Sequence, residues 1–172
     1  IIHIGSWLYN TLAVLHDMDV VHLDIKPANI LYSEGSKKLY LIDFGFSCKT
    51  VPTPVIGCDD KSKGTPYYMA PETWTSKKKD DYNIYKKSDV WSAGVTLYYV
   101  LNQYKPWDPR LGSIPQREKL TAFRRYVLAN QPRKSKYLPG ISEAISASLI
   151  VNATERPSAK RIYEYLYSQY KI

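Results

Sequence analysis

The chain has 172 residues, of which 44% are hydrophobic and 23% charged, and its formal net charge is +8. This length allows one sizeable domain with its own core, and the composition is ordinary for a globular protein. The basic residues are scattered among acidic ones, so we expect a solvated basic surface and no nucleic-acid partner. The longest strongly apolar run, residues 93–101, is too short to span a bilayer.

The two cysteines, Cys48 and Cys58, do not make a disulfide scaffold in a chain of this size. Neither of them has neighbours at metal-ligand spacing. Both observations favour a reducing compartment, and we expect an intracellular, cytoplasmic protein. The sequence begins at Ile1, directly before the first expected helix, which suggests a cut chain.

The first third of the chain is expected to form one helix and a small hairpin. Apolar residues at helical spacing predict an amphipathic helix over residues 4–17. Short apolar runs predict strands at 20–21, 30–32 and 39–42, and turn residues at 33–36 join the last two strands into a hairpin.

The remainder is expected to be mainly helical. Residues 46–70 carry several breakers and no sustained periodicity, which is typical of a functional irregular segment. The other expected elements are a polar exposed excursion at 75–87, a buried helix at 88–101 with Ser88 as a possible N-cap, a loop at 102–116, helices around 120–127 and 141–149 separated by residues 132–140, and a last helix capped by Ser158.

The loop between the first two strands concentrates polar chemistry in an apolar setting. Asp24 is followed by Lys26 at +2 and by Asn29 at +5. Apolar runs on both sides would hold this loop rigidly, which is how functional sites are commonly displayed.

This loop, residues 22–31, resembles the catalytic loop of protein kinases, H-R-D-x-x-x-x-N, with Leu23 in place of the arginine. Four further motifs follow in the kinase order. They are Asp43-Phe44-Gly45, Ala70-Pro71-Glu72, Asp89-Val90-Trp91-Ser92-Ala93-Gly94 and Arg156-Pro157-Ser158. The sequence over residues 4–170 is therefore similar to the larger lobe of a serine/threonine protein kinase.

The resemblance implies an α+β, predominantly helical fold, a kinase-like C-lobe in which one small β-hairpin carries the catalytic and metal-binding loops. Residues 1–172 are then the C-lobe of a kinase catalytic domain, and the N-lobe is absent from this chain. No G-x-G-x-x-G loop occurs in the sequence. We therefore expect these residues alone to transfer phosphate poorly or not at all.

The resemblance also implies catalytic roles for three residues. Asp24 would accept the proton of a substrate hydroxyl, and Lys26 would offer its charge to the transferring phosphate. Thr65 would hydrogen-bond near both side chains and shape the substrate site. Lysine at the +2 position marks serine/threonine rather than tyrosine kinases. The alternatives are that Asp24 caps a turn and that Lys26 is an exposed loop lysine.

ATP and Mg²⁺ are the implied cofactors. Asn29 and Asp43 would hold Mg²⁺, which takes oxygen ligands, together with the nucleotide phosphates, which Lys26 also contacts. Leu31 and Ile42 would form the floor under the adenine. The alternatives are a turn residue for Asn29, an Asx turn for Asp43, and plain core packing for Leu31 and Ile42.

Other motif residues are expected to be structural. The resemblance pairs Glu72 with Arg156 and directs Asp89 to backbone N–H groups of the catalytic loop. His22 and Phe44 are expected to pack in the core.

Leu23 carries a regulatory hypothesis. An arginine at this position commonly pairs with a phosphorylated residue of the irregular segment, and leucine cannot. We expect activity to be independent of phosphorylation at the four candidate hydroxyls, which are Ser47, Thr50, Thr53 and Ser62.

The sequence thus predicts a kinase that transfers the ATP γ-phosphate to serine or threonine of a protein substrate. The alternative is a shortened kinase-like pseudokinase or scaffold that binds partners without catalysis. A basic nucleic-acid-binding module is the third hypothesis, and no motif supports it. The protein substrate and the oligomeric state stay open.

Overall fold

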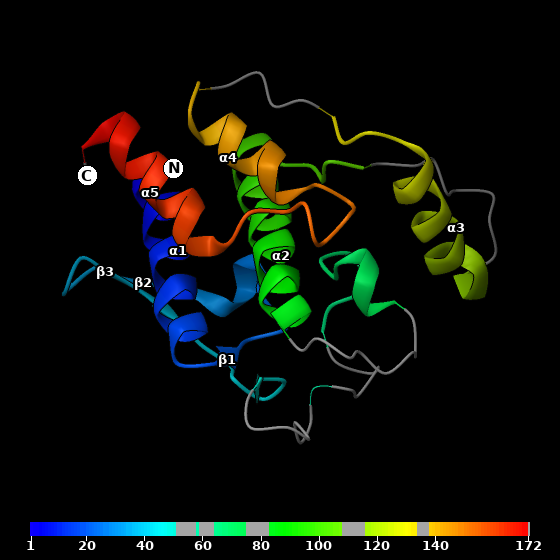
Figure 1. Cartoon of the computed structure of the whole chain (residues 1–172), viewed down its shortest axis with the longest axis horizontal. Helices are drawn as coiled ribbons and strands as arrows, with labels where there is room; N and C mark the ends of the chain where they lie inside the picture. The colour runs from blue at the N-terminus through cyan, green and yellow to red at the C-terminus, as the bar shows by residue number, and fades with distance from the viewer. Residues whose placement is uncertain (51–57, 59–63, 75–82, 108–115, 134–137, 172) are drawn as a thin grey trace.

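The computed structural model describes residues 1–50, 58, 64–74, 83–107, 116–133 and 138–171. Five α-helices are present within these ranges (Figure 1). They are α1 (Ile2–Asp17), α2 (Asn83–Asn102), α3 (Gln116–Ala129), α4 (Ile141–Ser148) and α5 (Ala159–Tyr170). The shorter elements are strands β1 (Val20–Val21), β2 (Ile30–Ser33), β3 (Lys38–Leu41) and β4 (Cys48–Lys49), with 3₁₀ turns η1 (Pro27–Asn29) and η2 (Pro71–Thr73). No helix of the described residues is long and apolar enough to cross a membrane.

Helix α2 lies at the centre of the core. It carries buried residues on all sides, because α1 and α4 both pack against it while α5 lies beside α1 (Figure 1). At Gly94 the approach of α4 is so close that an added Cβ would lie 2.6 Å from the Cβ of Ser148. The expected buried helix is therefore confirmed, and glycine is needed where it meets α4.

The predicted start of this central helix is wrong. Helix α2 begins at Asn83, so Ser88 is an interior residue whose hydroxyl donates to Glu72 and to the carbonyl of Ile84. Part of the expected polar excursion is thus helical, and Tyr85 within it is buried.

Two antiparallel strand pairs flank the helices. The expected hairpin pairs β2 with β3, in a register that places Ile30 opposite Leu41. A second pair joins β1 to β4, with Val21 opposite Cys48. Strand β4 was not predicted, and it connects the irregular segment to the strand that leads into the polar loop.

The last helix confirms its predicted cap. The Ser158 hydroxyl oxygen accepts a hydrogen bond from the Arg161 N–H at 3.2 Å, which satisfies one of the free donors at the start of α5.

The two cysteines form a disulfide, although the sequence indicated no disulfide framework. Cys48 and Cys58 are joined with a Cα–Cα distance of 5.5 Å, within the range that a disulfide requires. Their spacing of ten residues gave no reason to expect the bond, which depends on how the chain folds back.

Candidate active site

The polar loop is anchored to the central helix through its backbone. Both carboxylate oxygens of Asp89 accept hydrogen bonds at 2.8 Å, one from the N–H of His22 and one from the N–H of Leu23. Asp89 is fully buried, and Nε2 of His16 lies 3.0 Å from the same carboxylate. The predicted contact of Asp89 with this loop is confirmed. The role of His16 was missed, because nothing in its local sequence distinguishes it from other residues of α1.

His22 ties the loop to the end of the hairpin. Its Nδ1 accepts from the N–H of Asp24 at 3.2 Å, so Nε2 carries the proton and donates to the carbonyl of Ile42 at 3.0 Å. The ring is fully buried, as predicted. Phe44 meets it edge-on with ring centroids 4.8 Å apart, but 45% of Phe44 is exposed. The prediction that Phe44 packs in the core is therefore wrong.

Three side chains converge on the carboxylate of Asp24, which is itself buried. Lys26 Nζ lies 2.7 Å from Oδ2, and the amide of Asn29 donates to the same oxygen at 3.0 Å. The hydroxyl of Thr65 donates to Oδ1 at 2.7 Å and accepts from Lys26 at 2.8 Å. Residues that are up to 41 positions apart in the chain thus form one hydrogen-bonded group.

The surroundings of Asp24 favour its charged form. Burial by itself raises the pKa of this carboxyl, but hydrogen bonds from Lys26, Thr65 and Asn29 and the charge of Lys26 outweigh it and hold the pKa below its usual range. Asp24 is therefore ionised at neutral pH and can accept a proton there.

Asn29 and Asp43 come together at the end of the hairpin. The N–H of Ile42 donates to the carbonyl of Asn29 at 2.9 Å, which brings Asp43, the next residue, close to this loop. The Asn29 amide nitrogen is used in its two bonds to Asp24, which leaves the amide oxygen as the atom able to ligate a cation. Asp43 is exposed and accepts from the N–H of Gly45 at 3.3 Å, so the Asx turn is also present. The donor set of one amide oxygen and one carboxylate fits Mg²⁺.

The hairpin presents apolar side chains to solvent beside this site. Leu31 is 51% exposed, so plain core packing does not account for it, whereas Ile42 is partly buried. Tyr32 and Tyr40 on the same hairpin are exposed as well.

The hydroxyls that flank Cys48 are engaged with the backbone near the polar loop. Ser47 donates to the carbonyl of His22 at 3.3 Å, and Thr50 donates to the carbonyl of Asp19 at 3.3 Å. Thr53 and Ser62, the other two candidate phosphorylation sites, lie outside the described residues.

Glycine is required immediately before Thr65. Gly64 has φ of +97°, and an added Cβ would lie 2.8 Å from the carbonyl oxygen of Leu23. A side chain at this position would therefore push Thr65 away from Asp24. Only the close approach of the two loops shows why glycine matters at this position.

Replacing Gly64 with alanine is expected to lower the free energy of unfolding by at least about 1–2 kcal/mol, because of the positive φ and the clash with Leu23. Urea-induced unfolding measures this change. Gly35→Ala is the matched control, because nothing lies within 4 Å of its added Cβ, and its effect should stay within about 0.5 kcal/mol. Equal effects of the two substitutions would contradict the argument.

Comparison with known proteins identifies the family of this chain. The family sequence model for the protein kinase domain matches residues 2–168. The chain therefore belongs to the protein kinase family, and its fold is that of the larger, mostly helical lobe, with leucine where the catalytic loop commonly has arginine.

Individual relatives support the same family assignment. The chain is 32% identical over 168 residues to protein R436 of Acanthamoeba polyphaga mimivirus, covering 96% of this chain and 55% of that protein. It is 33% identical to serine/threonine-protein kinase 10-A of Xenopus laevis, covering 92% of this chain and 16% of that protein. The structure of the Cydia pomonella granulovirus kinase PK-1 has the same fold, with a TM-score of 0.67 at 22% identity, over 96% of this chain and 55% of the other. The chain thus spans about half the length of the mimivirus protein and a smaller share of the Xenopus kinase.

Proposed function

We propose that this chain is the larger lobe, residues 1–172, of a catalytically active serine/threonine protein kinase. The observation that carries the proposal is the convergence of Lys26, Thr65 and Asn29 on the ionised carboxylate of Asp24. A scaffold without catalysis has no need of this arrangement. The relatives named as serine/threonine kinases support the same specificity.

Each side chain has a distinct part in the proposed reaction. Asp24 orients the serine or threonine hydroxyl of a protein substrate and accepts its proton. Lys26 balances negative charge near the transferred group. Thr65 hydrogen-bonds to both Lys26 and Asp24 and fixes their relative positions. Phosphoryl transfer depends mainly on such positioning and charge stabilisation.

The cofactors are proposed on the family's general use of ATP and Mg²⁺. Asn29 and Asp43 would hold the cation, Lys26 would contact the phosphates, and Leu31 and Ile42 would lie beneath the adenine. When bound, the nucleotide supplies the γ-phosphoryl group and the metal ion neutralises its charge. The partly exposed apolar hairpin suits contact with a flat base. We place the protein in the cytoplasm, where protein kinases usually act.

Replacing Asp24 with asparagine in the full-length protein is expected to lower the rate of phosphate transfer at least about 100-fold, because the proton acceptor is lost. The assay follows labelled phosphate from ATP–Mg²⁺ onto peptides that differ only in carrying serine, threonine or tyrosine. The wild type should label serine and threonine peptides and leave the tyrosine peptide unlabelled.

Asp17→Asn is the matched control, because this exposed aspartate at the end of α1 lies outside the site, and its rate should equal the wild-type rate. Equal rates for wild type and Asp24→Asn would remove Asp24 from catalysis. A wild type that binds nucleotide and transfers no phosphate would favour the scaffold instead.

A further inference from the structure

We propose that Cys48 and Cys58 form a redox-sensitive clasp that fastens Cys58 to strand β4, which pairs with the strand leading into the catalytic loop. In the disulfide state Cys58 is fastened there covalently, and reduction removes this bond. The proposed effect on phosphate transfer rests on the kinase function above, whereas the effect on the structure does not.

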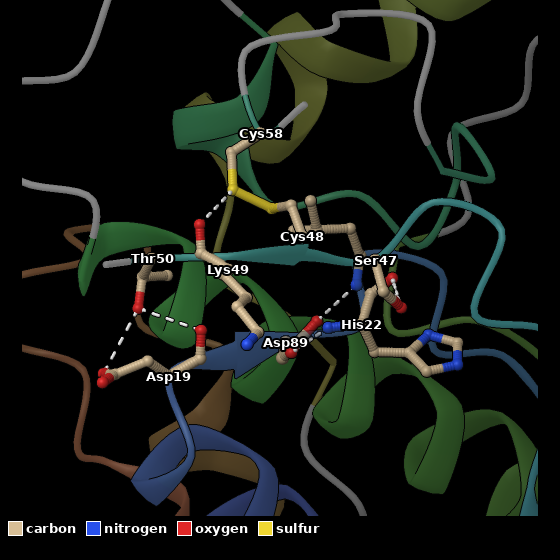
Figure 2. The surroundings of a disulfide bond; sticks show 9 residues. Asp19, His22, Ser47, Cys48, Lys49, Thr50, Cys58 and Asp89 are labelled. Atoms are coloured by element: carbon tan, nitrogen blue, oxygen red, sulfur yellow. Dashed lines mark hydrogen bonds between the residues drawn. A yellow bond between two sulfur atoms is a disulfide. The ribbon is translucent and has the colours of Figure 1, made fainter. Parts of the chain in front are cut away.

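The clasp lies in a small apolar cluster separate from the main core. Val21, Cys48, Cys58 and Tyr85 are its buried members, and Leu23 and Ile84 pack against them. Cys48 is 8% exposed and Cys58 is 3% exposed. Of residues 51–63, the structure describes Cys58 alone, so the disulfide is the described link between this part of the chain and the cluster (Figure 2).

A short mechanical path joins the disulfide to the catalytic loop. Cys48 lies in β4 opposite Val21 in β1, and β1 continues directly into His22 and Leu23. Beside this pair, the Thr50 N–H donates to the carbonyl of Asp19 at 2.8 Å. Figure 2 shows the Thr50 hydroxyl bonded to the same residue. A movement of Cys48 is therefore passed through the strand pair to residues adjoining Asp24.

The position of Leu23 explains why a disulfide suits this site. Leu23 belongs to the catalytic loop and packs on the disulfide cluster, so the surroundings of the loop on this side are apolar. An unpaired phosphate or arginine would be costly to bury in such surroundings. A covalent sulfur–sulfur bond brings no charge into the cluster and can fasten Cys58 there.

The cluster accommodates both oxidation states. Sγ of Cys58 lies 3.4 Å from the carbonyl oxygen of Lys49 (Figure 2). A disulfide sulfur carries no proton, so this contact becomes a hydrogen bond only in the reduced form, where the thiol can donate. Reduction thus replaces the covalent bond with a weak, reversible S–H···O hydrogen bond, which holds Cys58 far less firmly.

The chemical step is a thiol–disulfide exchange with a small-molecule disulfide such as oxidised glutathione. One cysteine thiolate attacks a glutathione sulfur, forms a mixed disulfide and releases one glutathione thiolate, which takes up the proton. The second cysteine thiolate then attacks the protein sulfur of the mixed disulfide and releases the second glutathione. Two protein thiols and one oxidised glutathione give one protein disulfide and two reduced glutathiones.

The test equilibrates the full-length protein in buffers of defined reduced-to-oxidised glutathione ratio. Alkylation followed by peptide mass mapping locates the disulfide. Hydrogen exchange is then followed at the amides of His22, Leu23 and Thr50. We expect these amides to exchange at least tenfold more slowly in the oxidised wild type, and we expect phosphate transfer to be at least fivefold faster in that state.

Cys58→Ser is the matched control, because its hydroxyl can still donate to Lys49 but cannot form the disulfide. It should behave like the reduced wild type in every buffer, and Cys48→Ala should do the same. A wild type that never forms the bond, that shows equal amide exchange in both states, or that transfers phosphate faster when reduced would overturn the clasp.

The two proposals fail in different ways. A redox-dependent change in amide exchange without any phosphate transfer would refute the kinase activity and support the clasp. Phosphate transfer with exchange that is equal in both redox states would support the kinase activity and refute the clasp.

Discussion

Replacing Arg156 with methionine is expected to lower the free energy of unfolding by about 3–5 kcal/mol, because the carboxylate of Glu72 then stays buried without its partner. The guanidinium is fully buried and pairs with both Glu72 oxygens, at 2.6 and 3.1 Å. It also donates to the carbonyls of Lys87 at 2.6 Å and Ile150 at 3.0 Å, and it lies 5.0 Å from the ring centroid of Trp91. No other side chain offers this planar set of donors.

Urea-induced unfolding measures the change, and the pair Lys86–Asp19 provides the control. That ion pair has a similar distance of 2.7 Å but is partly exposed, so Lys86→Met should cost less than about 1 kcal/mol. The double variant Glu72→Met/Arg156→Met should be more stable than Arg156→Met, because it leaves no unpaired charge. A loss below 1 kcal/mol for Arg156→Met would show that the pair does not hold these segments together.

Replacing Asp89 with alanine is expected to lower the free energy of unfolding by about 2–6 kcal/mol. The change leaves the N–H groups of His22 and Leu23 buried without acceptors, at about 1–3 kcal/mol each. It also removes the contact with His16. Since the same amides position the catalytic loop, phosphate transfer should fall together with stability.

Urea-induced unfolding and hydrogen exchange at His22 and Leu23 provide the measurement. Asp89→Asn should lie between the wild type and Asp89→Ala, because one acceptor oxygen remains. The exposed Asp17→Ala is the matched control and should change stability by less than about 0.5 kcal/mol. Unchanged amide exchange in Asp89→Ala would mean that the loop is held by other contacts.

Helical periodicity predicted most of the fold correctly. The pattern over residues 4–17 corresponds to α1, and Ser158 caps α5 as expected. The start of α2 was misplaced because Lys86 and Lys87 were expected to belong to a solvent-exposed, non-helical excursion. In the structure Lys86 pairs with Asp19, and Lys87 donates to the carbonyl of Arg156. Their partners are remote in sequence, so no local pattern could reveal them.

The motifs predicted the site better than they predicted its surroundings. The contacts of Asp89 with the loop and of Thr65 with Asp24 were anticipated from the resemblance and are present. The exposure of Phe44 was not anticipated, because hydrophobicity alone indicates burial while the neighbouring elements decide how much of a ring they cover. The roles of the site residues in catalysis stay predictions.

The sequence by itself determined the helical lobe and the family and predicted the site residues, because these depend on short-range periodicity and on motifs along the chain. The tertiary structure alone decided the disulfide, the β1–β4 pair and the distances around Asp24. Those features join residues that are distant in sequence, such as Leu23 with Asp89 across 66 positions. Whether such residues meet depends on how the helices pack together, and no local segment specifies that packing.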